Sequence, residues 1–139
     1  MLINKSGTKI DVKRAHCLKG LSKPLQKSAK AFLLGAAYCW CKNRKGKPFS
    51  AADLVGGHDV DWSGTPLMGI RQSYLRHKDQ DAAEKLAGVA VGWLLRDALE
   101  ESNGVYAYMR TTGKYVAHYS RTKLTEVFMA VVFFVLSFF

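Results

Sequence analysis

Lysine and arginine side chains are crowded into the first 50 residues of this chain. Of the 21 Lys and Arg residues in the 139-residue sequence, 12 lie in residues 1–50, where Asp11 is the single acid. Residues 1–50 therefore carry a net charge of +11, whereas residues 51–139, with nine cations and ten acids, carry −1. Such a field attracts polyanions, and release of their condensed counterions gives affinity that does not depend on base sequence. The charge pattern predicts binding to nucleic acid phosphates.

The cations in this half of the chain are regularly spaced. Lysines recur at every fourth position from Lys5 to Lys13 and from Lys19 to Lys27, which places each run on one face of a helix or strand. Such a face is either simply solvated or turned toward a polyanion. The side chains expected to contact phosphates are Lys19, Lys23, Lys27, Lys30, Lys42, Arg44, Lys45 and Lys47. The last four lie at the expected C-terminal end of a helix, where cations also complement the helix dipole.

A helix expected over residues 67–77 offers side chains that suit base edges. Arg71, Gln72 and Arg76 lie on it, and Arg and Gln carry the paired donors and acceptors that bases require. The sequence therefore predicts that this helix positions the protein on nucleic acid or reads bases.

Residues 105–120 alternate apolar and polar positions around a glycine-containing turn, which predicts a β-hairpin. Arg110 and Lys114 lie near its turn and are expected to contact the nucleic acid backbone. The four tyrosines of the hairpin either stack on unpaired bases or cover the core.

Five further residues have side chains that bind metals: Cys39, Cys41, His58, Asp59 and Asp61. The Cys-x-Cys spacing departs from that of zinc sites, and no second matching pair follows it. Buried cysteines and turn-forming aspartates explain the same residues. No Walker-type glycine loop and no Gly-x-Ser-x-Gly elbow occurs in the sequence. We expect neither a metal nor a cofactor, and the balance is against an enzyme.

Four helices are expected to position these side chains. The first runs from residues 22–24 to residues 43–46, and the others cover residues 51–55, 67–77 and 81–102. The longest should be the spine of the core, because it carries a wide apolar stripe: Leu86, Val89, Ala90, Trp93, Leu94 and Ala98. Gly88 and Gly92, four residues apart on it, predict a point where another helix crosses closely.

Together these elements predict a single α+β domain, mostly helical with a C-terminal β-hairpin, in an order compatible with a winged helix. We divide the chain into a basic N-terminal segment (1–21), a helical core with the hairpin (22–121) and an apolar C-terminal element (122–139). A short strand around residues 8–14 is a further option. Residues 127–139 contain one polar side chain, and they are interpreted as a buried element, an oligomer contact or a partial membrane anchor.

We therefore expect a non-enzymatic nucleic-acid-binding protein, with DNA favoured over RNA. An alternative is a small inhibitor of the phage or plasmid type, which docks an acidic host protein through its basic and aromatic surface. Membrane association through the apolar tail is a third option. The C-terminus could also join copies of the chain into a homo-oligomer. Three cysteines and no apolar segment at the N-terminus favour a cytoplasmic location.

Overall fold

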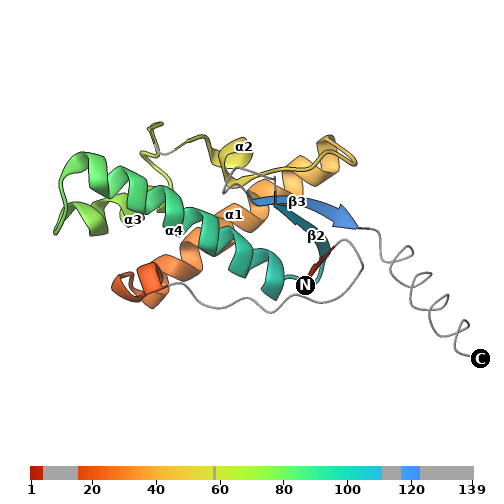
Figure 1. Cartoon of the computed structure of the whole chain (residues 1–139), viewed down its shortest axis with the longest axis horizontal. Helices are drawn as coiled ribbons and strands as arrows, with labels where there is room; N and C mark the ends of the chain where they lie inside the picture. Colours follow the sequence, from red (N-terminus) through yellow and green to blue (C-terminus); the bar gives the residue numbers. More distant parts are fainter. Residues whose placement is uncertain (5–15, 58, 111–116, 123–139) are drawn as a thin grey trace, which may run out of the picture.

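A computed structural model describes residues 1–4, 16–57, 59–110 and 117–122 of the chain. These residues form an α+β fold that is mostly helical and ends in a hairpin, as predicted (Figure 1). The elements are β1 (Leu2–Ile3), the 3₁₀ helix η1 (His16–Gly20), α1 (Lys23–Asn43), α2 (Ala51–Val55), α3 (Pro66–Leu75), α4 (Gln80–Glu101), β2 (Val105–Arg110) and β3 (Ala117–Thr122). The helix bounds differ from the predicted ones by two residues at most.

Helices α1, α2, α3 and α4 each begin at a side chain that accepts a hydrogen bond from the first turn. Ser22 accepts from the amide of Leu25 at the start of α1, and Asp79 accepts from the amide of Ala82 at the start of α4. Ser50 and Asp53 cap each other reciprocally at the start of α2. These bonds satisfy amides that have no partner within the helix. Capping residues marked the starts of the first three helices in the sequence, whereas the cap of α4, Asp79, lies two residues before its predicted start.

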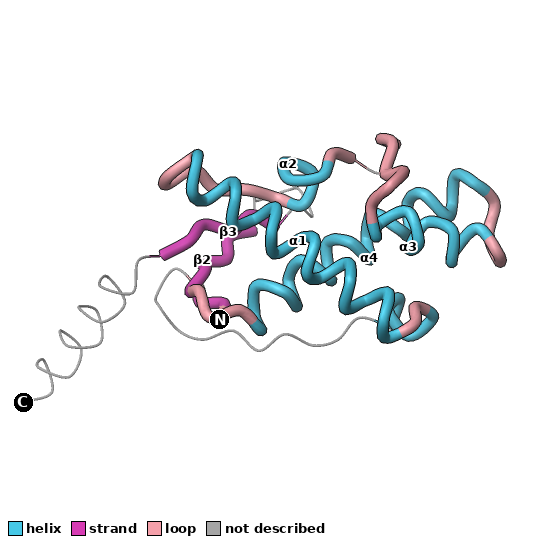
Figure 2. The backbone as a smooth tube through the Cα atoms, turned by 180° about the vertical axis from the view of Figure 1, so that it is seen from behind, coloured by secondary structure: helices cyan, strands magenta, loops and turns pink. Residues whose placement is uncertain are grey.

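Helices α1 and α4 cross each other, and α3 packs against both (Figures 1 and 2). The buried face of α4 consists of Ala83, Ala87, Ala90, Val91, Leu94, Leu95, Ala98 and Leu99. The apolar stripe predicted for this helix was too wide, because Val89 is 52% exposed and Leu86 and Trp93 are only half-buried. The rest of the described structure therefore packs on one side of the apolar stripe, and the other side is exposed to solvent.

The predicted helix crossing at Gly88 and Gly92 is wrong at Gly92. A Cβ atom placed on Gly92 would meet nothing within 4 Å, so no backbone approaches it. The close approach lies instead at Gly69 of α3, where a Cβ atom would stand 2.8 Å from Cδ1 of Leu25 in α1. Helix α3 therefore needs its glycine for packing, whereas α4 does not need Gly92 for that purpose.

The sheet has the strand order β1-β2-β3. Strands β2 and β3 form the predicted antiparallel hairpin, in register from Val105↔Thr122 to Arg110↔Ala117. Strand β1 lies parallel to β2, and the ammonium group of Met1 donates to the carbonyls of Leu99 and Gly104 at 2.9 and 3.0 Å. Residues from the start of the basic N-terminal segment are thus built into the sheet.

Two predicted features fall outside the described residues: the strand around residues 8–14 and the apolar element after Thr122. Within the described part of the chain, no helix is both long enough and apolar enough to cross a membrane.

Candidate nucleic-acid interface

The side chain of Trp40 contacts the residues that follow the end of α1. Helix α1 stops at Asn43, and the guanidinium group of Arg44 lies over the Trp40 ring, 4.5 Å from its centroid. The indole N–H of Trp40 donates to the carbonyl of Lys47 at 3.1 Å. Gly46, at a φ of 76°, lets the chain turn back between these two contacts. The four residues that follow α1 are thus wrapped around one tryptophan.

Phe49 joins this turn to strand β3. Its amide donates to the carbonyl of Tyr119 and its carbonyl accepts from the Tyr119 amide, both at 2.8 Å. Phe49 is completely buried, with its ring 5.9 Å from that of Tyr119. This bridge brings residues that are 70 positions apart in the sequence to the same end of the molecule.

Between the turn and the strand lies a hollow of about 820 Å³, which we call the basic groove. Its cations come from α1, from the turn and from β3: Lys42, Arg44, Lys45, Lys47 and Arg121. No Asp or Glu is among the lining residues. Tyr38 also lines the groove; the residue is 53% exposed, and the Arg121 guanidinium lies 5.7 Å from the centroid of its ring. The groove therefore combines uncompensated positive charge with an accessible aromatic face.

One thiol lines the basic groove. Burial raises the pKa of Cys41, and the positive charge of Arg121 opposes this effect without reversing it. The thiol is therefore protonated at neutral pH, so it does not neutralise the cations of the groove.

The lysines of the first half of α1 lie away from this groove. Lys23, Lys27 and Lys30 line a different hollow, of about 560 Å³, where Lys30 forms an ion pair with Glu101 at 2.9 Å. Lys23 and Lys42 lie 19 residues apart on α1, which is about 28 Å along a helix. The sequence predicted phosphate contacts for all these lysines without placing them relative to one another, and the structure puts them at two separate hollows.

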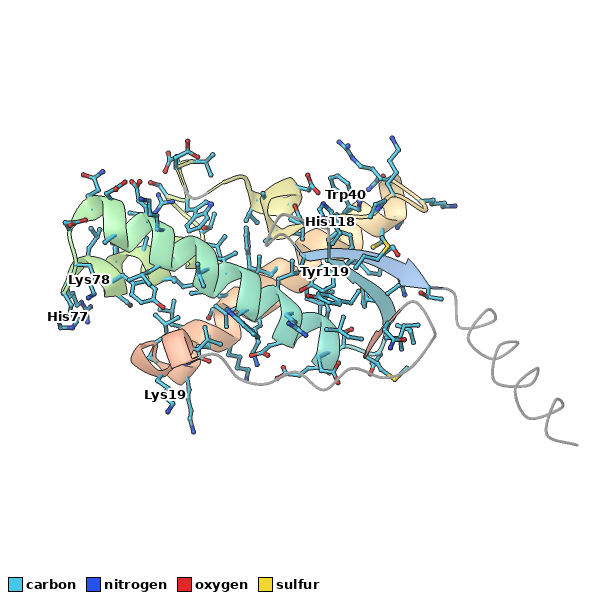
Figure 3. The ribbon with its side chains drawn as sticks, viewed as in Figure 1. Lys19, Trp40, His77, Lys78, His118 and Tyr119 are labelled. Atoms are coloured by element: carbon cyan, nitrogen blue, oxygen red, sulfur yellow. The ribbon has the colours of Figure 1, made fainter. Side chains whose placement is uncertain are left out.

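Gln72 and Arg76 are exposed, as predicted for residues that contact nucleic acid. They line a small hollow together with Gly20 and Ser22, beside the start of α1. Figure 3 shows Lys19, His77 and Lys78 toward this end of the molecule and Trp40 toward the other. These side chains therefore lie apart from the basic groove.

Arg71 was expected on an exposed face of α3, and the structure places it inside. Its side chain is 8% exposed, Nη1 donates to the carbonyl of Val60 at 2.9 Å, and the guanidinium lies 4.3 Å from the centroid of the Trp62 ring. It follows Leu67 by four positions, so it shares the buried face of the helix. A charge is retained there because the carbonyl and the indole compensate it. Arg71 is unavailable to bases.

The hairpin cations are only partly placed. The backbone of Arg110 ends β2, but its side chain and Lys114 fall outside the described residues. Arg121 and Tyr38 were not chosen as site residues from the sequence. Tyr38 lies off the buried positions Ala29, Leu33 and Ala37, so the helical spacing already indicated an exposed aromatic residue. Nothing in the sequence placed Arg121 beside it.

Among the residues considered for a metal site, those that the structure describes do not converge. Within the described part of the chain, no group of three or more His, Cys, Asp or Glu side chains is arranged to hold a metal ion. Asp61 accepts a hydrogen bond from the amide of Ser63 at 2.8 Å, and hydrogen bonding by Ser63 lowers the pKa of this carboxyl. Asp61 thus forms a turn, while His58 lies outside the described residues.

Comparison with protein-family models, with curated proteins and with solved structures found no match to this chain. The functional argument therefore depends on the residues themselves.

Proposed function

We propose that the protein binds nucleic acid through the basic groove and does so without catalysis. The observation that carries the proposal is the groove itself, in which five cations from three segments surround a hollow whose lining contains no acid. Cations held this way neutralise successive phosphates and release their counterions.

The exposed face of Tyr38 favours single strands. Its ring lies beside Arg121 at the groove, and bases stack on aromatic side chains when phosphates are held by neighbouring cations. Paired bases are already stacked on each other and would gain less from this ring. Because Arg71 is buried, the side chain of α3 that is best suited to contacting base edges in a duplex cannot reach them. Backbone contact and stacking therefore support binding with little sequence preference.

The test is a titration of the full chain with labelled single-stranded DNA, single-stranded RNA and duplex DNA over a salt series. The variant Lys45→Ala/Lys47→Ala removes two exposed cations of the groove. We expect it to weaken binding to all three ligands and to lower the log–log salt slope by about two. In the same titration, Tyr38→Ala should weaken single-strand binding by about tenfold and leave duplex binding nearly unchanged.

The matched control is Lys27→Ala/Lys78→Ala, which removes the same net charge from exposed positions outside the groove. It should change the salt slope much less. Equal losses for the two double variants would mean that net charge alone attracts nucleic acid, which would contradict a site at the groove. If the parent protein binds none of the three nucleic acids at about 150 mM salt, nucleic acid binding at the groove is refuted, and an acidic protein becomes the expected partner of the groove.

A further inference from the structure

A second hollow, of about 620 Å³, lies along α4 opposite α2. We call it the α4 groove; its lining includes Gly88, Gly92, Trp93 and Arg96 of α4, together with Ala52 and Trp62. Its volume is in the range of about 300–1,000 Å³ typical of small-molecule sites. It shares no lining residue with the basic groove.

The face of α4 that lines this hollow carries glycines at its centre, so no side chain of α4 occupies the space there. Gly88, Gly92 and Arg96 follow one another at spacings of four residues, so they lie on one side of the helix. Glycine weakens a helix, and Gly92 has no packing reason to be there, because a Cβ atom would meet nothing within 4 Å. The missing side chain leaves space that no described part of the protein fills.

Trp62 and Trp93 both line this space. Trp62 is 3% exposed, and its indole N–H donates to the carbonyl of Val55 at 3.0 Å, which fixes the ring. The half-buried Trp93 and the 52% exposed Val89 belong to the side of the α4 stripe that protein does not cover. A flat apolar molecule would cover this surface.

Arg96 places a positive charge at the groove. Its guanidinium lies 4.8 Å from the centroid of Tyr108 and 5.4 Å from that of Trp93, so two rings hold it in position. Its Nε is buried and has no hydrogen-bond partner among the described residues. The ion pairs in the described part of the chain join Lys30 to Glu101 and Lys85 to Asp81, and Arg96 takes part in neither. A cation held this way on an apolar surface is complementary to an anion.

We propose that the α4 groove binds a small molecule with a flat apolar body and one acidic group, either a carboxylate or a phosphate. The acidic group accepts hydrogen bonds from Arg96, and the body lies over Gly92 between Trp62 and Trp93. This site is independent of nucleic acid binding at the basic groove, so either proposal can fail alone.

The test uses two fluorescent probes that differ in charge: anilinonaphthalene sulfonate, a flat aromatic anion, and phenylnaphthylamine, its uncharged counterpart. We expect the anion to bind the full chain saturably at one site, at least about tenfold more tightly than the uncharged probe. Arg96→Met keeps an unbranched flexible side chain that matches the apolar stem of arginine, and it removes the guanidinium charge. This variant should bind the anionic probe about tenfold less tightly and bind the uncharged probe nearly as the parent protein does.

Gly92→Leu fills the groove without removing any contact, and it should abolish binding of both probes while the thermal midpoint is kept or raised. The matched control is Gly35→Leu in α1, a second helical glycine whose Cβ would meet nothing within 4 Å. It should bind both probes as the parent protein does. Unaltered binding by Gly92→Leu, or equal loss in both leucine variants, would overturn the site.

Competitors then define the ligand. Displacement of the bound probe by naphthoate or by naphthyl phosphate supports a carboxylate or a phosphate ligand, respectively. If neither competes, or if a short oligonucleotide displaces the probe from the parent protein, a small-molecule site at the α4 groove is refuted.

Discussion

At the scale of single residues, charge in this protein has two different uses. The guanidinium of Arg71 is buried against the Trp62 ring and bonded to the Val60 carbonyl, so it fixes the segment that leads into α3. Arg44 also lies over a tryptophan, but it remains exposed beside the basic groove. Burial separates the structural arginine from the one that can meet a ligand.

Arg71→Ala should therefore lower the free energy of unfolding, by about 2 kcal/mol, because it removes a charge-assisted hydrogen bond and a cation–π contact. Urea unfolding measures the loss, with Arg76→Ala as the control at the exposed C-cap of the same helix. The control should change stability by less than about 0.5 kcal/mol. A stable Arg71→Ala variant that binds nucleic acid less tightly would restore Arg71 as a contact residue.

At the scale of elements, two helical glycines have opposite environments. Gly69 lies where α3 meets Leu25 of α1, whereas the position of a Cβ atom on Gly92 of α4 is open. Sequence spacing drew attention to the α4 glycines, because four-residue spacing is common where helices cross. The crossing depends on which faces meet, and the pattern within one helix does not contain that information.

We expect Gly92→Ala to raise the free energy of unfolding by about 1 kcal/mol, which is the helix propensity difference. In Gly69→Ala the new methyl group would stand 2.8 Å from Cδ1 of Leu25, so that side chain must move and the propensity gain is offset. Urea unfolding of both variants tests this comparison. If both variants gain the same free energy of unfolding, then Leu25 moves without loss of stability, which would contradict the close α1–α3 contact at Gly69.

At the scale of the whole molecule, aromatic packing ties the sheet to the helices. Phe49 packs edge-on against Tyr106 at 6.3 Å and beside Tyr119 at 5.9 Å, and all three residues belong to the buried core. Burial raises the pKa of the Tyr106 and Tyr119 hydroxyls above their usual value. The folded chain therefore keeps protons at high pH that the unfolded chain releases.

The sign of the pH dependence follows from this difference. The stability contribution of these tyrosines is fully present below about pH 10, where tyrosine ionises in an unfolded chain, and it is lost as the pH rises further. Each retained proton steepens the loss by about 1.4 kcal/mol per pH unit. Thermal melts of Tyr119→Phe between pH 9 and pH 11 should fall less steeply than those of the parent. The exposed-tyrosine control, Tyr38→Phe, should behave as the parent does, and parallel curves for all three proteins would contradict this coupling.

Local chemistry explains what could be predicted from the sequence. Capping residues and turn-forming glycines act within a few positions, so the four helices and the hairpin were found with bounds within two residues at the helices. The two-residue strand β1 was missed, because its parallel partner begins at Val105 and no local pattern marks a parallel pair.

The sequence by itself determined the fold class and the concentration of positive charge, since both follow from composition and short-range spacing. Only the tertiary structure decided which cations share a surface. The bridge between Phe49 and Tyr119 brings Arg121 to the turn after α1, while the length of α1 separates Lys23 from Lys42. Contacts between distant segments depend on how helix faces pack. The same packing buries Arg71, and it leaves the α4 groove unfilled by the described residues.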